Sequence, residues 1–194
     1  VAKVYALNIV GSTLGALLTG YVLLDYVSVS SGFTLVGAAT LVIGLVSLLR
    51  GCPRCVWIAP VIVVGMIVTA DPDDRTLVVA ASRHAPGRIK TIIENRHGII
   101  HVVDDGEERG DVVYGGNVYD GRTNIDLRLN SNRVDRVYLL AALHPAPRKV
   151  LVIGLSTGAW ARILSTLPSL SQMDVVEINP GYLPLISAYP HLSP

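Results

Sequence analysis

A block of almost uncharged sequence at the start of the chain constrains its fold more than any other feature. Within residues 1–70 the charged side chains are those of Lys3, Asp25, Arg50 and Arg54. Three apolar runs fill this block, at about residues 4–24, 31–49 and 56–70. A helix rises about 1.5 Å per residue, so about twenty residues cross a hydrocarbon core of roughly 30 Å. We therefore expect transmembrane helices over these runs, the third of which is short and must recruit its flanks, thin the bilayer or lie partly buried.

Two other interpretations of the apolar block stay open. A cleaved signal peptide has a single apolar core followed by small residues, which three successive runs do not match. A buried globular core is the second alternative. We favour a multi-pass protein of the cell membrane, so the lipid bilayer is an expected partner.

The orientation of the chain in the membrane follows from its basic residues. Arg50 and Arg54 favour the cytoplasmic side for the loop between the second and third runs. We expect the soluble part to be cytoplasmic as well. The third run must then be re-entrant, or further helices must precede this sequence.

Cys52 and Cys55 form a Cys-x-x-Cys between the second and third runs. A thioredoxin-like site needs a strand before such a pair and a helix after it, and a zinc site needs two further ligands. We interpret the segment as a turn between helices, with a redox or lipidated pair as the alternative. His84, His97 and His101 do not have the spacing of metal ligands, so the sequence predicts no metal site.

The charged residues lie almost entirely after residue 70, and the formal net charge of the chain is +1. Nucleic-acid binding needs a basic surface to neutralise phosphates and aromatic side chains on which bases stack. A near-neutral chain with one Phe and two Trp gives no support for it. We expect no nucleic-acid partner.

Residues 71–132 have the pattern of a small β-rich subdomain. Runs rich in Val, Ile and Tyr occur at 76–81, 88–94, 98–103 and 111–119, with Gly, Pro and Asp between them. Such spacing favours an antiparallel meander. The loop acids Asp104, Asp105, Glu107 and Glu108 are expected to form a solvated turn, with attraction of polyamines as the alternative.

Residues 133–194 predict the start of a Rossmann-like α/β domain of the class I methyltransferase type. A helix is expected over 135–143, ending before Pro145, then a strand at 148–153, a helix over 159–167 and a strand at 173–178. Aliphatic strands of this kind are buried on both faces in parallel sheets, and together these elements form a βαβ unit. The fold class is therefore transmembrane helices, a β-rich segment and a truncated α/β domain, whose unpaired sheet edge favours homo-oligomers.

The turn between the two predicted parallel strands carries the first chemical signal. Gly154 and Gly158 bracket Leu-Ser-Thr, so a ligand can approach the backbone near the amino end of the next helix. Glu177 ends the second strand, where an acid can accept hydrogen bonds from both ribose hydroxyls of a nucleoside. The pattern is neither Gly-x-Gly-x-x-Gly nor a Walker A sequence. It is closer to an adenosyl pocket, with a βαβ unit that holds no ligand as the alternative.

A family resemblance is concentrated in residues 138–184. The segments Tyr-Leu-Leu-Ala-Ala-Leu-His (138–144), Pro-Ala-Pro-Arg-Lys-Val-Leu-Val-Ile-Gly (145–154) and Val-Val-Glu-Ile-Asn (175–179) resemble spermidine synthase. The runs at 5–11 and 179–184 resemble bacterial membrane proteins in which transporter-like helices are fused to a spermidine-synthase-like domain. The resemblance implies aminopropyl transfer from decarboxylated S-adenosylmethionine to an amine or polyamine.

The resemblance also implies roles for individual residues. The loop residues Gly154, Ser156, Thr157 and Gly158 would hold decarboxylated S-adenosylmethionine, and Glu177 would hold its ribose hydroxyls. Tyr138 and His144 would line the amine and cofactor pocket, with Asp135 as an acid of the amine site. Boundary residues of a helix are the alternative for Tyr138 and His144.

Three departures from the family pattern qualify these roles. Thr157 stands where the family has a loop Asp, and Thr cannot neutralise an ammonium group. The family's acidic pair is reduced to Val134-Asp135. Its catalytic Asp lies on a later strand, beyond Pro194, so the catalytic residue is unknown and residues 1–194 alone are expected to be inactive. A non-catalytic adenosyl-binding or regulatory domain, and an accessory domain of a transporter-like protein, remain alternatives to the enzyme.

Overall fold

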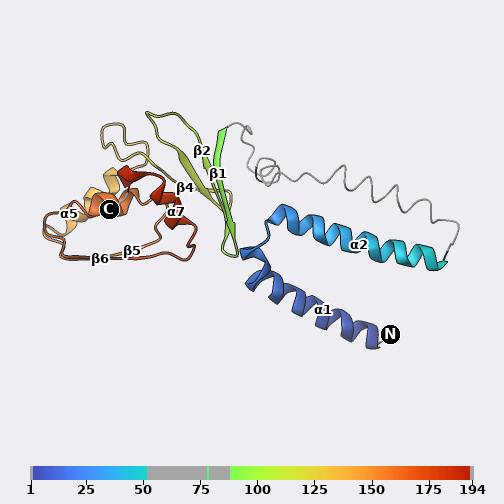
Figure 1. The fold of residues 1–194 in the computed structure, drawn as a ribbon. Helices are drawn as coiled ribbons and strands as arrows, with labels where there is room; N and C mark the ends of the chain where they lie inside the picture. The colour runs from blue at the N-terminus through green and yellow to red at the C-terminus, as the bar shows by residue number, and fades with distance from the viewer. Residues whose placement is uncertain (1, 52–77, 79–87, 193–194) are drawn as a thin grey trace. The chain divides into compact units, whose positions relative to one another are not determined.

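The computed structural model describes residues 2–51, 78 and 88–192 (Figure 1). The chain divides into two compact units, residues 1–80 and 81–194, and each is described by itself. The third apolar run at 56–70, Cys52, Cys55 and His84 lie outside the described residues. The same holds for the strand predicted at 76–81, apart from Val78.

The first unit contains two long apolar helices, as predicted. Helix α1 spans Ala2–Tyr21, the short 3-10 helix η1 spans Leu23–Asp25, and α2 spans Val29–Gly51. By length and composition alone, the segments Ala2–Asp25 and Val29–Val46 could cross a membrane, and neither window is buried. Because both lie near the N-terminus, a signal sequence would share these features.

Several hydroxyl groups of these helices form local hydrogen bonds. The Ser28 hydroxyl accepts the Ser31 amide at 3.2 Å, which caps the start of α2. The hydroxyls of Ser12, Thr34 and Thr40 donate to carbonyls four residues earlier, at 2.7–3.1 Å. Such bonds leave few polar groups to be solvated, which suits an apolar environment.

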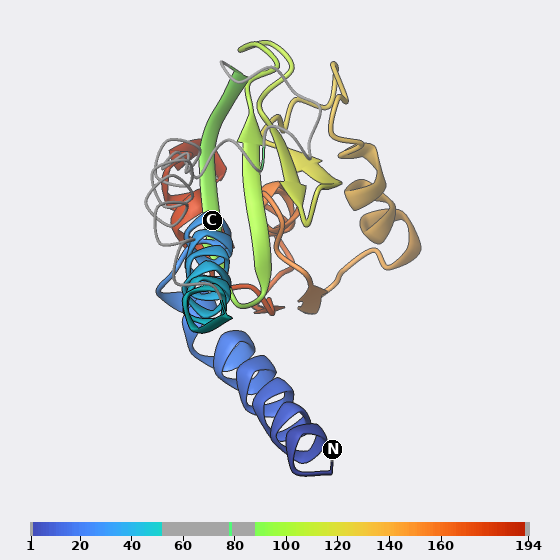
Figure 2. The same cartoon turned by 90° about the vertical axis from the view of Figure 1, so that its right-hand side faces the viewer.

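The predicted antiparallel meander is present in the second unit (Figure 2). Strands β1 (Ile89–Asn95), β2 (Gly98–Val103), β3 (Val112–Gly115) and β4 (Val118–Arg122) form one sheet in sequential order. The single strand predicted at 111–119 is wrong: the chain turns at Gly116 and Asn117, both with positive φ, and returns as β4. Two residues with positive φ fit the twist of a hairpin, so this dipeptide was the sequence signal for the turn.

The predicted βαβ unit is confirmed. Helix α5 spans Asp135–Leu143, β5 spans Lys149–Ile153, α6 spans Ala159–Leu164 and β6 spans Gln172–Val176. Strands β5 and β6 are parallel, with Lys149 opposite Gln172 and Ile153 opposite Val176. Helix α7 (Tyr182–Ser187) and a 3-10 turn, η4 (Pro190–Leu192), follow.

Helix α6 is shorter than the predicted 159–167. The Ser165 and Thr166 hydroxyls each donate to a carbonyl three residues earlier at 2.7 Å, to Arg162 and Ile163 respectively. These bonds offer the backbone an alternative to further helical turns, and Pro168 disfavours helix at the residue before it. The helix therefore ends at Leu164.

The prediction that the parallel strands are buried on both faces is wrong for the described residues. Val150, Val152 and Met173 pack with α5 and α6, whereas Leu151 and Ile153 on the opposite face are 61% and 82% exposed. Alternating side chains point to opposite faces of a strand, and the described helices cover only one of them. These strands therefore carry more apolar side chains than the described part of the chain buries.

The meander and the α/β segment share a core. Ile100, Val102 and Val113 of the sheet pack with Tyr182 and Leu185 of α7. At the edge of this contact, the Asn95 amide donates to the Asn179 side-chain oxygen at 2.7 Å, which also accepts the Gly181 amide at 2.9 Å. Residues from both sides of the predicted 132/133 boundary thus hold each other in place, and the domain division itself stays a prediction.

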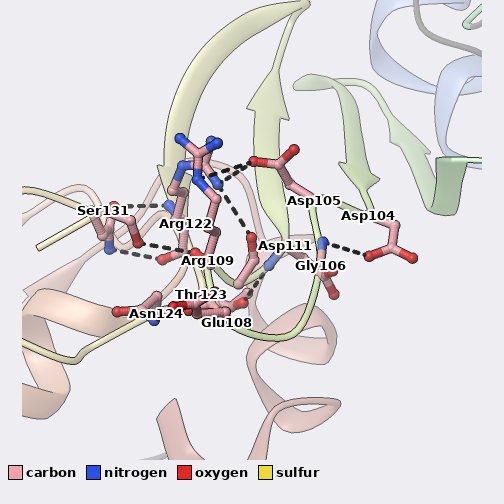
Figure 3. Close-up of polar contacts among 12 residues, drawn as sticks. Asp104, Asp105, Gly106, Glu108, Arg109, Asp111, Arg122, Thr123, Asn124 and Ser131 are labelled. Carbon is pink, nitrogen blue, oxygen red and sulfur yellow. Dashed lines mark hydrogen bonds and ion pairs between the residues drawn. The ribbon is translucent and has the colours of Figure 1, made fainter. Parts of the chain in front are cut away.

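The acidic turn is an ion-pair network and not only a solvated loop (Figure 3). The Asp105 carboxylate lies 2.7 Å from the Arg122 guanidinium and 3.1 Å from that of Arg88. The hydrogen bond from Arg122 lowers the pKa of Asp105 below its usual value. In Asp104, a hydrogen bond from the Gly106 amide likewise lowers the pKa.

Asp111 joins the start of β3 to the C-terminal segment. Its carboxylate accepts hydrogen bonds from the Lys90 ammonium at 2.7 Å and from the Tyr189 hydroxyl at 2.6 Å. The bond to Asp111 raises the pKa of Lys90, and burial followed by the same carboxylate raises that of Tyr189. The His191 ring contacts the Thr123 carbonyl at 3.0 Å, which fixes the η4 turn against the sheet.

We predict that the Asp105 network stabilises the fold only while this carboxylate is charged. Because the pKa of Asp105 is lower in the folded state, its contribution is present above the usual value of 3.8 and is lost as pH falls through the folded-state pKa. Asp105→Asn should cost about 1 kcal/mol at pH 7, discounted for partial exposure. The difference in melting temperature from wild type should stay constant from pH 7 down to the usual pKa of 3.8 and shrink as the pH falls below it. A difference that does not shrink below this pH would contradict the prediction. Glu107→Gln, a loop carboxylate outside the Asp105 ion pairs, is the control.

A second prediction concerns close packing at the glycine turn. Gly154 and Gly158 both have positive φ, 86° and 78°, but a Cβ at Gly158 would lie 2.9 Å from Ile186 Cδ1, whereas one at Gly154 meets nothing within 4 Å. Gly154→Ala should show only backbone strain of about 1–2 kcal/mol. Gly158→Ala should lower the free energy of unfolding further, by about 1–3 kcal/mol. Chemical denaturation of both variants measures the difference, and equal losses would exclude the close contact.

Candidate functional site

Glu177 and the glycine turn meet at the carboxyl ends of the two parallel strands. Oε2 of Glu177 accepts the Leu155 amide at 2.7 Å, and Oε1 accepts the Asn179 amide at 2.8 Å. The Gly154 amide donates to the Val176 carbonyl at 2.8 Å, which extends the pairing of β5 and β6 into the turn. The predicted proximity of the acid and the turn is thus what the structure has.

The turn holds three residues in the left-handed region. Gly154, Ser156 and Gly158 have φ of 86°, 49° and 78°. Ser156 is the costly one, because L-residues other than Gly, Asn and Asp seldom adopt this region. Its hydroxyl donates to the Asp120 carbonyl at 2.8 Å, which compensates for the strain by tying the turn to β4.

A mostly apolar cavity of about 660 Å³ adjoins the Glu177 carboxylate. Its lining consists of His97, Leu155, Val175, Glu177, Ile178, Pro180, Leu183, Ile186 and Ser187. Ligand sites are typically of this size and have apolar walls with a few polar groups. A carboxylate has about four lone-pair positions, so the two amide bonds leave Glu177 able to accept two hydroxyl hydrogens.

The predicted loop residues do not all face this cavity. Among the loop residues only Leu155 is part of its lining. Thr157 is 3% exposed, and its Cγ2 would lie 3.4 Å from a Cβ at Gly121, so its side chain packs under β4. The Ser156 hydroxyl donates its hydrogen bond to the Asp120 carbonyl. Contact of a ligand with Ser156 or Thr157 stays a prediction, whereas the open space beside Gly154 leaves its backbone accessible.

Helix α5 carries the other predicted residues. Asp135 begins this helix, Tyr138 is 42% exposed on it, and His144 is its exposed C-terminal cap. None of the three is among the residues that line the cavity beside Glu177. Their role in amine binding stays a prediction.

A second cavity, of about 460 Å³, was not foreseen from the sequence. It lies among the β1–β2 turn, the β3–β4 hairpin and the start of α7, and it shares His97 and Ile178 with the first cavity. The polar side chains in its lining include those of Asp120, Asn179 and Tyr182. Burial, followed by a hydrogen bond to Asp120, raises the pKa of the Tyr182 hydroxyl.

Metal binding finds no support in the described part of the chain. Within residues 2–51, 78 and 88–192, no group of three or more His, Cys, Asp or Glu side chains is placed to hold a metal ion.

Comparison with known proteins gives a consistent family signal. The whole chain is 30% identical over 207 aligned residues to polyamine aminopropyltransferase 2 of Streptomyces coelicolor, where the match takes in 36% of the relative. A stretch of 41 residues is 49% identical to polyamine aminopropyltransferase of Streptococcus pneumoniae, in two strains. These similarities support the spermidine-synthase-like family. The chain spans little more than a third of the length of the Streptomyces relative.

Two further comparisons found nothing. No protein-family model matches the chain. No solved structure matches it either. Support for the family therefore comes from the curated relatives, and support for the fold comes from the geometry of the described residues.

Proposed function

We propose that this protein is a membrane-anchored, spermidine-synthase-like aminopropyltransferase, and that the cavity beside Glu177 holds the adenosyl part of decarboxylated S-adenosylmethionine. The observation that carries the proposal is the Glu177 carboxylate, fixed through both oxygens at the carboxyl ends of β5 and β6. The similarity to polyamine aminopropyltransferases supports the same chemistry.

The reaction joins an amine to the aminopropyl group. The nitrogen lone pair of the acceptor amine attacks the methylene carbon beside the sulfonium, a C–N bond forms as the C–S bond breaks, and methylthioadenosine leaves with the electron pair. The amine loses one proton to a base. Catalysis in such a displacement comes mainly from positioning two ligands and from removing that proton.

In this proposal the residues of this chain bind and orient the two ligands. Glu177 accepts the ribose hydroxyls, and the apolar walls formed by Leu155, Ile178 and Leu183 enclose the base. Asp135, Tyr138 and His144 contribute to amine binding in the intact protein. These roles cover binding and orientation, and the transfer itself also needs a base that accepts the amine proton.

The membrane part of the proposal depends on α1 and α2. Both are long and apolar enough to span a bilayer, and the hydroxyls of Ser12, Thr34 and Thr40 donate to carbonyls of their own helix. We propose that they anchor the protein in the cell membrane with the α/β segment in the cytoplasm, where the cosubstrate is available.

A second candidate is a non-catalytic adenosyl-binding or regulatory domain. The buried Thr157 in place of a loop acid favours it, because a neutral hydroxyl cannot balance the charge of an ammonium group. The two candidates differ in turnover: both bind methylthioadenosine, but only the enzyme transfers the aminopropyl group.

We predict that Glu177→Gln weakens methylthioadenosine binding about tenfold to a hundredfold, since hydrogen bonds to a charged group contribute about 1.5–3 kcal/mol. Calorimetry on the protein that carries residues 1–194, in detergent, measures this change. Asp174→Asn, which removes an exposed carboxylate from β6, the strand that precedes Glu177, should leave the affinity unchanged.

The ligand can be varied to separate a direct contact from a loosened turn. With 2′,3′-dideoxy-methylthioadenosine, the effect of Glu177→Gln should largely disappear, because the hydroxyls that it contacts are absent. A loss of equal size with both ligands would show that Glu177 only supports the turn. Wild-type protein that binds neither ligand would defeat the proposed function.

A further inference from the structure

The cavity of about 460 Å³ next to the nucleoside cavity has an acidic side chain in its lining. Its lining residues are His97, Gly98, Ile99, Gly115, Gly116, Val118, Tyr119, Asp120, Ile178, Asn179 and Tyr182. Asp120 is the carboxylate in this lining, and none of the described residues that line this cavity or its neighbour is a Lys or Arg. The two cavities together therefore present two carboxylates, Asp120 and Glu177, and favour a cationic ligand.

Tyr182 lines the same cavity as Asp120. A Cβ built at Gly115 would lie 2.5 Å from the Tyr182 hydroxyl oxygen and 3.8 Å from Asp120 Oδ2, so both groups border the same small space. Burial, followed by the Asp120 carboxylate, raises the pKa of this hydroxyl. Tyr182 itself is 7% exposed, so its ring is fixed in the core while its hydroxyl faces the cavity. Gly115 leaves the room for this hydroxyl, because it has no Cβ. A buried phenol thus lies beside an exposed carboxylate at this cavity.

The position where the family pattern has an acid cannot supply one to a ligand in this chain. Thr157 is neutral and buried under β4. Yet decarboxylated S-adenosylmethionine and polyamines both carry primary ammonium groups, which need a carboxylate when they leave water. Asp120 lies on β4, the strand whose carbonyl holds the Ser156 hydroxyl of the same turn.

We propose that Asp120, which shares its cavity with Tyr182, is the residue that binds a primary alkylammonium group beside the nucleoside cavity and replaces the acid missing at position 157. This inference rests on the proposed function and names the cation site within it. The ammonium group comes either from the aminopropyl arm of the adenosyl ligand or from the acceptor amine, and both have the same chemistry.

The test compares ligands with and without the ammonium group. Dissociation constants of methylthioadenosine, decarboxylated S-adenosylmethionine and putrescine are measured by calorimetry on wild type and Asp120→Asn in detergent. Asp120 is exposed and its hydrogen bond with Ser156 uses the backbone carbonyl, so Asn at this position should retain the fold. Loss of one charge-assisted hydrogen bond predicts about tenfold weaker binding of the ligand whose ammonium group Asp120 holds. Methylthioadenosine should bind both proteins equally.

Each outcome is informative. Weaker decarboxylated S-adenosylmethionine binding assigns Asp120 to the aminopropyl arm, and weaker putrescine binding assigns it to the acceptor; either supports the proposal. Unchanged affinity for both ammonium ligands overturns it while leaving the nucleoside site intact. The control is Glu107→Gln, which removes the same charge from a loop that lines a separate cavity and should change none of the three affinities. Absence of methylthioadenosine binding to wild type would instead defeat the proposed function.

Discussion

The carboxylate of Glu177 fixes the geometry on which the rest of the site depends. Its two oxygens accept the amides of Leu155 and Asn179, so it joins the turn after β5 to the turn after β6. The Asn179 side chain then accepts the Gly181 amide at the start of α7 and the side-chain amide of Asn95 on β1. A single acid at a strand end therefore organises both turns and, through Asn179, the contact with the meander.

The meander also contributes to the site, since His97 in its β1–β2 turn lines the cavity beside Glu177. Its β4 strand holds the glycine turn through the Ser156 hydroxyl and buries Thr157. Its β2 and β3 strands pack against α7 and position Tyr182. This arrangement changes what the loop can do: its hydroxyl residues maintain the architecture, while Leu155 and the Gly154 backbone remain for a ligand. In our proposal, the role of binding an ammonium group therefore belongs to Asp120 of β4, beside Tyr182 of α7.

Much of the fold could be predicted because short-range patterns determine it. The aliphatic runs around Gly154–Gly158 specify a βαβ unit, and parallel strands joined by a helix must place their carboxyl ends together, which brings Glu177 to the turn. The β3–β4 hairpin could also have been predicted, since Gly116-Asn117 is a turn signal. The exposure of Leu151 and Ile153 was not, because burial on a second face depends on elements other than the strand itself.

By itself, the sequence determined the two apolar helices, the meander and the adjacency of Glu177 to its turn, since each depends on local periodicity or on a short connection. Only the tertiary structure decided that Thr157 is buried, that Ser156 bonds to Asp120, and that Asp120 and Tyr182 meet at a second cavity. Asp120 and Tyr182 come from separate elements and share no sequence pattern. Their proximity follows from the packing of β4 and α7 in one core, which no local preference specifies.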